Sequence, residues 1–109
     1  MNIPEEGYLL RIFVGESDKL GHIPLYEAIV LKAREAGLAG ATVLRGVLGF
    51  GRKSVVHTAK ILRLSEDLPM VVEIVDSLEK IEAFLPILDQ SITEGLVTLE
   101  RVRVIHYRS

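Results

Sequence analysis

The amino-acid sequence predicts an α+β fold in which two helices pack on one face of a four-stranded antiparallel sheet. The chain has 109 residues, the length of a single domain. Two strand-like apolar segments are each followed by a segment with helical periodicity and then by another strand, so the two halves form a faint internal repeat. With right-handed crossovers, this βαββαβ order allows few arrangements, and the simplest is a ferredoxin-like sandwich. We therefore expect one domain over residues 1–109.

The first half begins with an apolar strand and continues into a helix. Residues 8–14 are almost all β-branched, aromatic or long apolar side chains, which is typical of a central strand, and Gly15 ends it. Residues 16–22 are polar and predict a loop. We expect a helix between Pro24, which suits the first helical turn, and Gly37, which suits the position after a helix. Apolar residues recur between them at spacings of three and four: Leu25, Ala28, Ile29, Ala33 and Ala36.

A long loop separates the two halves. Residues 41–45 predict a short strand, and three glycines follow it within six residues. Glycine at this density disfavours regular structure, so we expect a flexible loop over residues 46–60, with 61–64 as its return and 65–67 as a turn. Long loops inside small domains are uncommon and are usually functional.

The second half repeats the strand and helix. Residues 70–75 predict the third strand. Asp76 and Glu79 have the spacing of a capping box, which starts a helix by accepting hydrogen bonds from its first N–H groups. A helical apolar stripe continues to about Ser91, and Pro86 inside it predicts a kink or a break.

The last strand is expected over residues 96–105, after a turn at Gly95. The open sheet face, meaning the face away from the helices, should then be half apolar. Strand alternation assigns to it Leu9, Arg11, Phe13, Val71, Glu73, Val75, Arg101 and Arg103. Such a surface usually meets a partner, which favours an oligomer formed through this face. Arg11 and Glu73 would lie on neighbouring strands and form a cross-strand ion pair.

Composition excludes several classes of protein. A net charge of −2 and an isoelectric point near 5.9 argue against a binder of nucleic acid or of anionic membranes. The absence of cysteine excludes disulfide frameworks, thiolate metal sites and thiol nucleophiles. The first residues have no signal-peptide pattern, and no apolar run is long enough for a membrane span, so we expect a cytoplasmic location.

The polar residues predict neither a metal site nor a catalytic centre. His22, His57 and His106 stand in separate segments without the spacing of metal ligands. The sequence has no nucleophile elbow and suggests no triad. This favours a binding protein over an enzyme.

Residues 49–53 are the strongest candidate for ligand chemistry. Their glycines allow backbone N–H groups to approach a phosphate closely, and their arginine adds a charged bidentate fork. The same pattern occurs in plain hairpin loops, so the residues alone leave an anion site and a structural loop both open.

The sequence also resembles a known family. Val-Leu-Gly-Phe-Gly-Arg-Lys at residues 47–53 is similar to the start of the T-loop in PII signalling proteins, which carry a Gly-Phe-Gly-Arg run here in the same βαββαβ order. Still closer is the PII-like family known as the domain of unknown function number 190. Its members share Leu-Arg-Ile-Phe-Val-Gly-Glu, Pro-Leu-Tyr-Glu and Ala-Thr-Val-Leu-Arg-Gly, found here at residues 10–16, 24–27 and 41–46.

This resemblance implies a homotrimer whose sheets face the threefold axis, with clefts between subunits that bind an adenine nucleotide. Carried over by position, the ligand-binding residues would be Gly49, Gly51, Arg52, Lys53, Arg101 and Arg103. PII proteins have a Gly-Asp-Gly-Lys turn before the last strand, whereas residues 93–97 here contain one glycine and no lysine. We therefore expect AMP or ADP as the ligand rather than ATP.

The resemblance also implies a ligand sensor and not an enzyme. Loop 46–60 would respond to the ligand and contact a partner, such as a protein or a membrane transporter. Two alternatives stay open: an enzyme acting on a small phosphorylated metabolite in the same cleft, and a structural trimer without a ligand.

Overall fold

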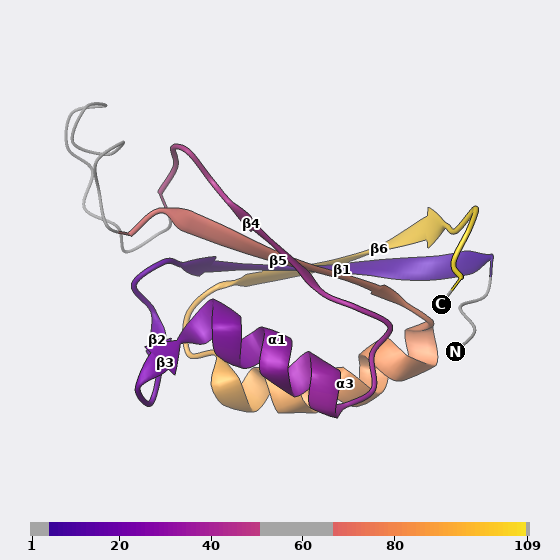
Figure 1. Ribbon diagram of the computed structural model, residues 1–109, viewed down its shortest axis with the longest axis horizontal. Helices are drawn as coiled ribbons and strands as arrows, with labels where there is room; N and C mark the ends of the chain where they lie inside the picture. Colours follow the sequence, from indigo (N-terminus) through magenta and orange to yellow (C-terminus); the bar gives the residue numbers. More distant parts are fainter. Residues whose placement is uncertain (1–4, 51–66, 109) are drawn as a thin grey trace.

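The computed structural model describes residues 5–50 and 67–108 and arranges them in two layers, a sheet and a pair of helices (Figure 1). In chain order the elements are β1 (Glu6–Gly15), β2 (Lys19–Leu20), β3 (Ile23–Pro24), α1 (Leu25–Glu35), β4 (Thr42–Arg45), β5 (Pro69–Asp76), α3 (Leu78–Ser91) and β6 (Leu96–Arg103). Residues 46–50 of the predicted loop are neither helix nor strand. The rest of that loop, its predicted return and most of the predicted turn at 65–67 lie outside the described residues.

The main sheet has the strand order β4-β5-β1-β6, and every neighbouring pair is antiparallel. The central pair, β1 and β5, runs in register from Tyr8 opposite Asp76 to Gly15 opposite Pro69. Both helices lie on the same face of this sheet (Figure 1). The predicted α+β ferredoxin-like sandwich is therefore confirmed.

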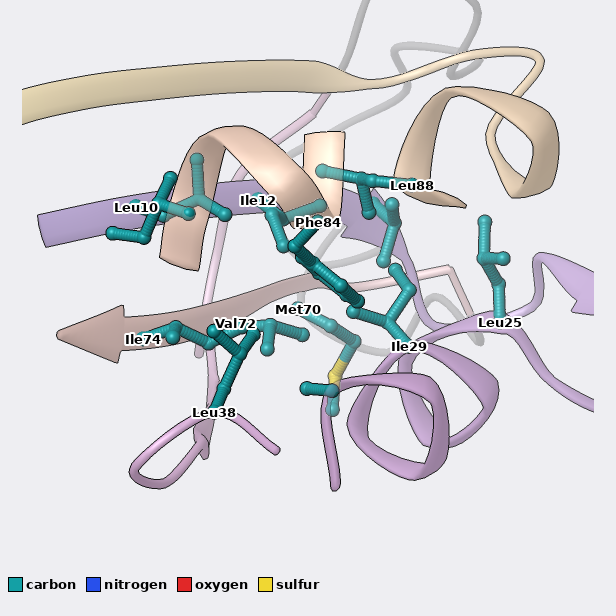
Figure 2. Close-up of a cluster of buried hydrophobic side chains, with 13 residues drawn as sticks. Leu10, Ile12, Leu25, Ile29, Leu38, Met70, Val72, Ile74, Phe84 and Leu88 are labelled. Carbon is teal, nitrogen blue, oxygen red and sulfur yellow. The ribbon is translucent and has the colours of Figure 1, made fainter. Parts of the chain in front are cut away.

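Alternation along the two central strands supplies the core. Six inward side chains of β1 and β5 are buried: Leu10, Ile12 and Val14, and opposite them Met70, Val72 and Ile74. They meet apolar side chains of the helices, among them Leu25 and Ile29 of α1 and Ile81, Phe84 and Leu88 of α3 (Figure 2). Helix α1 packs on β5 and α3 on β1. Each large apolar side chain that is buried fully contributes about 1.5–3 kcal/mol, so this layer holds the sheet and helices together.

The segment predicted as a plain loop, residues 16–22, contains part of a second, two-stranded sheet. Leu20 of β2 pairs with Ile23 of β3 around a turn at Gly21. The Leu25 N–H donates to the Asp18 carbonyl over 2.7 Å, which fixes the hairpin at the start of α1. Periodicity could not reveal strands of two residues, so the loop prediction was wrong here. Pro24 ends β3 and is the N-cap residue of α1, one position before the first turn in which it was predicted, and it makes no side-chain capping hydrogen bond.

The start of α3 differs from the predicted capping box by one residue. Ser77 is the N-cap, and its hydroxyl accepts a hydrogen bond from the Lys80 N–H over 3.3 Å. The Asp76 carboxylate instead accepts from the N–H groups of Ser77 (2.7 Å) and Ala39 (2.9 Å). A buried carboxylate needs such donors, so Asp76 joins the start of α3 to the segment before β4.

Helix α3 runs through Pro86 to Ser91, so the predicted break does not occur. Phe84 and Leu88, on either side of the proline, are both buried in the core. Their packing holds the two halves of the helix on the sheet, although Pro86 supplies no N–H for a helical hydrogen bond.

Replacing the N-cap is expected to weaken the fold measurably. Ser77→Ala leaves the Lys80 N–H without its acceptor and should lower the free energy of unfolding by about 1 kcal/mol. Ser77→Asp keeps an acceptor and should stay close to the wild type. Chemical denaturation of the three proteins checks this, and equal stabilities of Ser77→Ala and the wild type would contradict the assignment of the cap.

The last strand is shorter than predicted, because β6 ends at Arg103 and not at residue 105. The Val104 N–H donates to the Glu5 carbonyl over 2.6 Å, and residues 104–108 then continue without regular structure. In the part of the chain that the structure describes, no helix combines the length and apolar character needed to cross a membrane.

Candidate ligand site

The loop root, defined as residues 46–50, lies at the start of β5. The Gly46 N–H donates to the Pro69 carbonyl over 2.7 Å. Gly49 has a φ of +156°, and a Cβ there would lie 3.1 Å from Cγ of Pro69, so a side chain is disfavoured. Gly49 thus lets the loop root pass close to the first residue of β5. The other predicted residues of this motif, Gly51, Arg52 and Lys53, lie outside the described residues.

An ion pair fixes the strand that leads into the loop root. Arg45, the last residue of β4, places Nε and Nη2 each 3.0 Å from a carboxylate oxygen of Glu16. Two parallel contacts of this kind restrain a guanidinium more than a single one does. The loop root is therefore held to the β1–β2 connection on one side and to β5 on the other.

The other predicted ligand residues, Arg101 and Arg103, lie on β6. The prediction that both face the open side of the sheet is wrong, because the alternation of β6 is shifted by one residue from the predicted one. Arg101 pairs with Tyr8, which packs on the helix side, whereas Val102 pairs with Gly7 on the open side. Because the residues of β6 are nearly all exposed, its apolar residues do not mark a core-facing row, and their alternation misled the prediction.

Both arginines make ion pairs on the surface. Arg101 Nε lies 3.1 Å from Glu6 Oε1, and Arg103 Nη2 lies 2.9 Å from Glu5 Oε1. All four side chains are well exposed, and pairs of this type contribute about 0–1 kcal/mol. A ligand anion could therefore replace either carboxylate at little cost in stability.

The predicted ligand residues that the structure describes lie at opposite ends of the sheet, with Gly49 in the loop root at one end and Arg101 and Arg103 on β6 towards the other. Gly15 pairs with Pro69 at the loop root, whereas Glu6 pairs with Arg103. From Glu6 to Gly15 is nine steps along β1, or roughly 30 Å at about 3.3 Å per residue. One copy of the chain does not bring Gly49 and Arg103 together.

A pocket of about 630 Å³ lies on the open sheet face, at the end away from the loop root. Leu9, Val75 and Val102 give it apolar walls, and Arg11, Glu73 and Thr42 add polar groups. Two segments enclose it from opposite edges of the sheet: residues 39–42, which lead into β4, and residues 103–107, which lead out of β6. Strand alternation had placed Leu9 and Val75 on this face, but no pattern in the sequence indicated that the chain after β6 returns over it.

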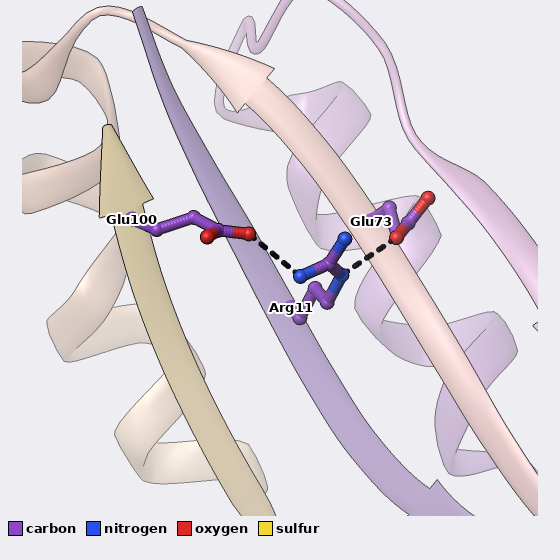
Figure 3. A network of polar contacts seen from close by, with 3 residues as sticks. All are labelled: Arg11, Glu73 and Glu100. Carbon is purple, nitrogen blue, oxygen red and sulfur yellow. Dashed lines mark hydrogen bonds and ion pairs between the residues drawn. The ribbon is translucent and has the colours of Figure 1, made fainter. Parts of the chain in front are cut away.

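Arg11 lies beside this pocket between two carboxylates (Figure 3). Its Nε donates to Glu73 Oε2 over 2.8 Å and its Nη1 to Glu100 Oε1 over 2.7 Å. The hydrogen bond to Glu73 is the main cause that raises the pKa of Arg11, so the guanidinium stays charged. The predicted pair of Arg11 with Glu73 is confirmed, and Glu100 was missed because of the register error in β6.

At the other end, the open sheet face carries an apolar row across all four strands. Register aligns Leu44, Val71, Phe13 and Leu96 in neighbouring positions. Leu44 and Leu96 are 50 % and 57 % exposed, and Phe13 and Val71 are partly exposed. The loop root also carries exposed apolar side chains: Val47, Leu48 and Phe50. The open sheet face is therefore half apolar, as predicted, and the interface expected on it stays a prediction.

The described part of the chain contains no group of three or more His, Cys, Asp or Glu side chains that could hold a metal ion. His22 lies in the β2–β3 turn and His106 beside the pocket, while His57 lies outside the described residues.

Comparison with known proteins identifies relatives of the whole domain. The family model described as "Uncharacterized ACR", the domain of unknown function number 190, matches residues 7–104. A UPF0166 protein of Aquifex aeolicus (strain VF5) is 42 % identical over 98 residues, which cover 90 % of this chain and 92 % of that protein.

Two solved structures share the fold. One is from Thermus thermophilus and is described as a PII-like signalling protein. It has a TM-score of 0.63 and 16 % identity, and the match covers 92 % of this chain and 90 % of that one. The other is CPII of Thiomonas intermedia, a nitrogen regulatory PII-like protein bound to ADP, AMP and bicarbonate. It has a TM-score of 0.58 and 16 % identity, covering 94 % and 97 %. The chain belongs to the family of the domain of unknown function number 190, as its sequence motifs predicted.

Proposed function

We propose that this protein is a regulatory ligand sensor that forms a homotrimer and binds an adenine nucleotide in clefts between its subunits. The observation that carries the proposal is the separation of the predicted ligand residues. Gly49 and Arg103 lie at opposite ends of β1 in one protomer, so a site that uses both needs two copies. The CPII structure with ADP and AMP supports this class of ligand.

A ring of copies satisfies this requirement. A contact between the loop root of one copy and the β6 end of the next is head-to-tail, and such contacts can close into rings. The apolar row through Phe13 supplies an unpartnered surface on the face that would turn inward. The resemblance to PII proteins supports three copies.

The pocket on the open sheet face suits the base of a nucleotide. Leu9, Val75 and Val102 offer apolar contact to a flat ring, and the Glu73 carboxylate offers an acceptor for an exocyclic amine. The phosphate would extend towards Arg103, which lines the pocket, and towards residues 49–53 of the neighbouring copy. Since the turn at residues 93–97 has no lysine, AMP or ADP fits better than ATP.

Signalling would proceed through loop 46–60. Ligand binding would shift the population of loop conformations and so change how the loop contacts a partner protein or membrane transporter. This role needs no catalytic residue, and we assign none. We place the protein in the cytoplasm, where adenine nucleotides are available.

Titration calorimetry with AMP, ADP and ATP tests the ligand. Arg52→Ala should lose about 1.5–3 kcal/mol of binding free energy, as expected for a lost hydrogen bond to a charged group. Arg34→Ala, which removes an exposed arginine on α1, is the matched control and should bind like the wild type. Equal affinities of Arg52→Ala and the wild type, or no binding by either, would refute the proposed site.

Two further measurements separate the alternatives. Conversion of a nucleotide or another small phosphorylated metabolite at a rate that Arg52→Ala abolishes would favour an enzyme. A thermal-shift screen in which no ligand raises the melting temperature would favour a structural trimer, because any ligand specific for the folded state must raise it.

A further inference from the structure

The segment after β6 crosses the open sheet face. It leaves the β6 edge at Val104, whose N–H donates to the Glu5 carbonyl. At Tyr107 it reaches the segment beside β4, where the Tyr107 hydroxyl donates to the Ala39 carbonyl over 3.1 Å. β6 and β4 are opposite edges of the sheet, three strand spacings or roughly 14 Å apart. The backbone of residues 104–107 and the Tyr107 side chain together bridge this distance. We call residues 104–108 the strap.

The strap forms one wall of the pocket. Residues 104–107 line the pocket from one side and residues 39–42 from the other. Most of the strap is exposed, and Ile105 is 72 % exposed, so burial of apolar surface holds it only weakly. Among the described residues, the hydrogen bond from Tyr107 is the side-chain contact that ties the strap to the far wall.

The acceptor of that hydrogen bond is itself held from the opposite side. The Ala39 N–H donates to Oδ2 of Asp76 over 2.9 Å, and Asp76 is 1 % exposed. A buried carboxylate with two backbone donors is a rigid anchor, because losing either donor leaves one of its buried oxygens without a partner. Asp76 therefore fixes the residue to which Tyr107 binds.

We propose that Tyr107 is a positioning residue of the ligand site: it latches the strap onto Ala39, and Asp76 holds Ala39 in place, so that the strap closes the pocket over a bound nucleotide. The part that concerns the nucleotide rests on the proposed function. The latch is a property of the chain alone and can be tested without any ligand. None of Tyr107, Ala39 or Asp76 was a predicted site residue.

Limited proteolysis tests the latch. Trypsin can cut after Arg103, at the base of the strap, and mass spectrometry detects loss of the strap. When opening is fast, the cleavage rate follows the population of the open form. Tyr107→Phe removes only the latching hydroxyl and should be cut about two- to tenfold faster, as expected for one lost hydrogen bond. Tyr26→Phe, which removes a tyrosine hydroxyl on α1, is the matched control. Cleavage of Tyr107→Phe at the wild-type rate would overturn the latch.

Dissociation of AMP tests the positioning role. AMP should leave Tyr107→Phe about two- to tenfold faster than the wild type. An unchanged rate of dissociation, with faster proteolysis, would overturn the role in the ligand site. If the wild type binds no AMP, the proposed function fails, and proteolysis alone decides the latch.

Asp76→Asn should also speed cleavage after Arg103, and circular dichroism shows whether that variant still folds.

Discussion

Phe13→Asp should convert the proposed homotrimer into monomers. Phe13 lies within the apolar row of the open sheet face, between Val71 of β5 and Leu96 of β6. In the proposed trimer this row is covered, and burying an unpaired carboxylate there costs several kcal/mol per protomer. In the monomer the same side chain is partly exposed and tolerates the charge, so the fold should remain.

Light scattering on a size-exclusion column measures the change. The wild type should give about three times the chain mass of 12.1 kDa, and Phe13→Asp should give the mass of one chain. Leu31→Asp is the matched control, because Leu31 is a 47 % exposed leucine on α1, away from the open sheet face. Persistence of the trimer in Phe13→Asp would show that the row is not the interface, and a monomeric wild type would refute the trimer itself.

Phe84→Ala should lower the free energy of unfolding several times more than Ser77→Ala does. Phe84 is 1 % exposed and is the bulkiest fully buried side chain among the described residues. It contacts the core between α3 and the central strands (Figure 2). Truncation removes apolar burial and leaves a cavity, so the free energy of unfolding should fall by about 3–5 kcal/mol.

Chemical denaturation at a fixed protomer concentration checks this value, since the stability of an oligomer depends on concentration. Ile87→Ala on the same helix is the control. Ile87 is 37 % exposed, and its truncation should change stability by no more than about 0.5 kcal/mol. Similar losses from both variants would contradict the assigned face of α3.

The architecture could be predicted because the alternation of side chains along the two central strands shows which face of the sheet the helices cover. Leu10, Ile12 and Val14 alternate with Leu9, Arg11 and Phe13, and only the first set is buried. A strand that is covered on one face by helices has this pattern, and the helical stripes supply the cover. The confirmed ion pair of Arg11 and Glu73 followed from the same alternation.

The edge strand could not be predicted in the same way. On β6, Val97 and Leu99 lie on the helix side but are exposed, while Val102 lies on the open side beside the pocket. Neither face is well covered within one copy of the chain, so apolar alternation does not identify the inner face. The wrong alternation predicted for β6 placed Arg101 and Arg103 on the open face. It placed Glu100 on the helix side, so its ion pair with Arg11 was not predicted.

The pocket was missed for a different physical reason. Its walls come from residues 39–42 and 103–107, which are far apart in the sequence and belong largely to segments without regular structure. The hydrogen bond between Tyr107 and Ala39 depends on the path of the chain after β6, which local propensity does not determine. The predicted site residues at 51–53 lie outside the described residues and remain a prediction.

Subunit mixing tests the shared site most directly. Arg52→Ala and Arg103→Ala chains are each expected to form trimers without the high-affinity nucleotide site. In trimers reassembled from equal amounts of both, about one quarter of the clefts should combine an intact Arg52 from one copy with an intact Arg103 from the next. Calorimetry with AMP should then recover about one quarter of the wild-type number of sites. Recovery of no sites in the mixture would contradict a cleft built from two subunits.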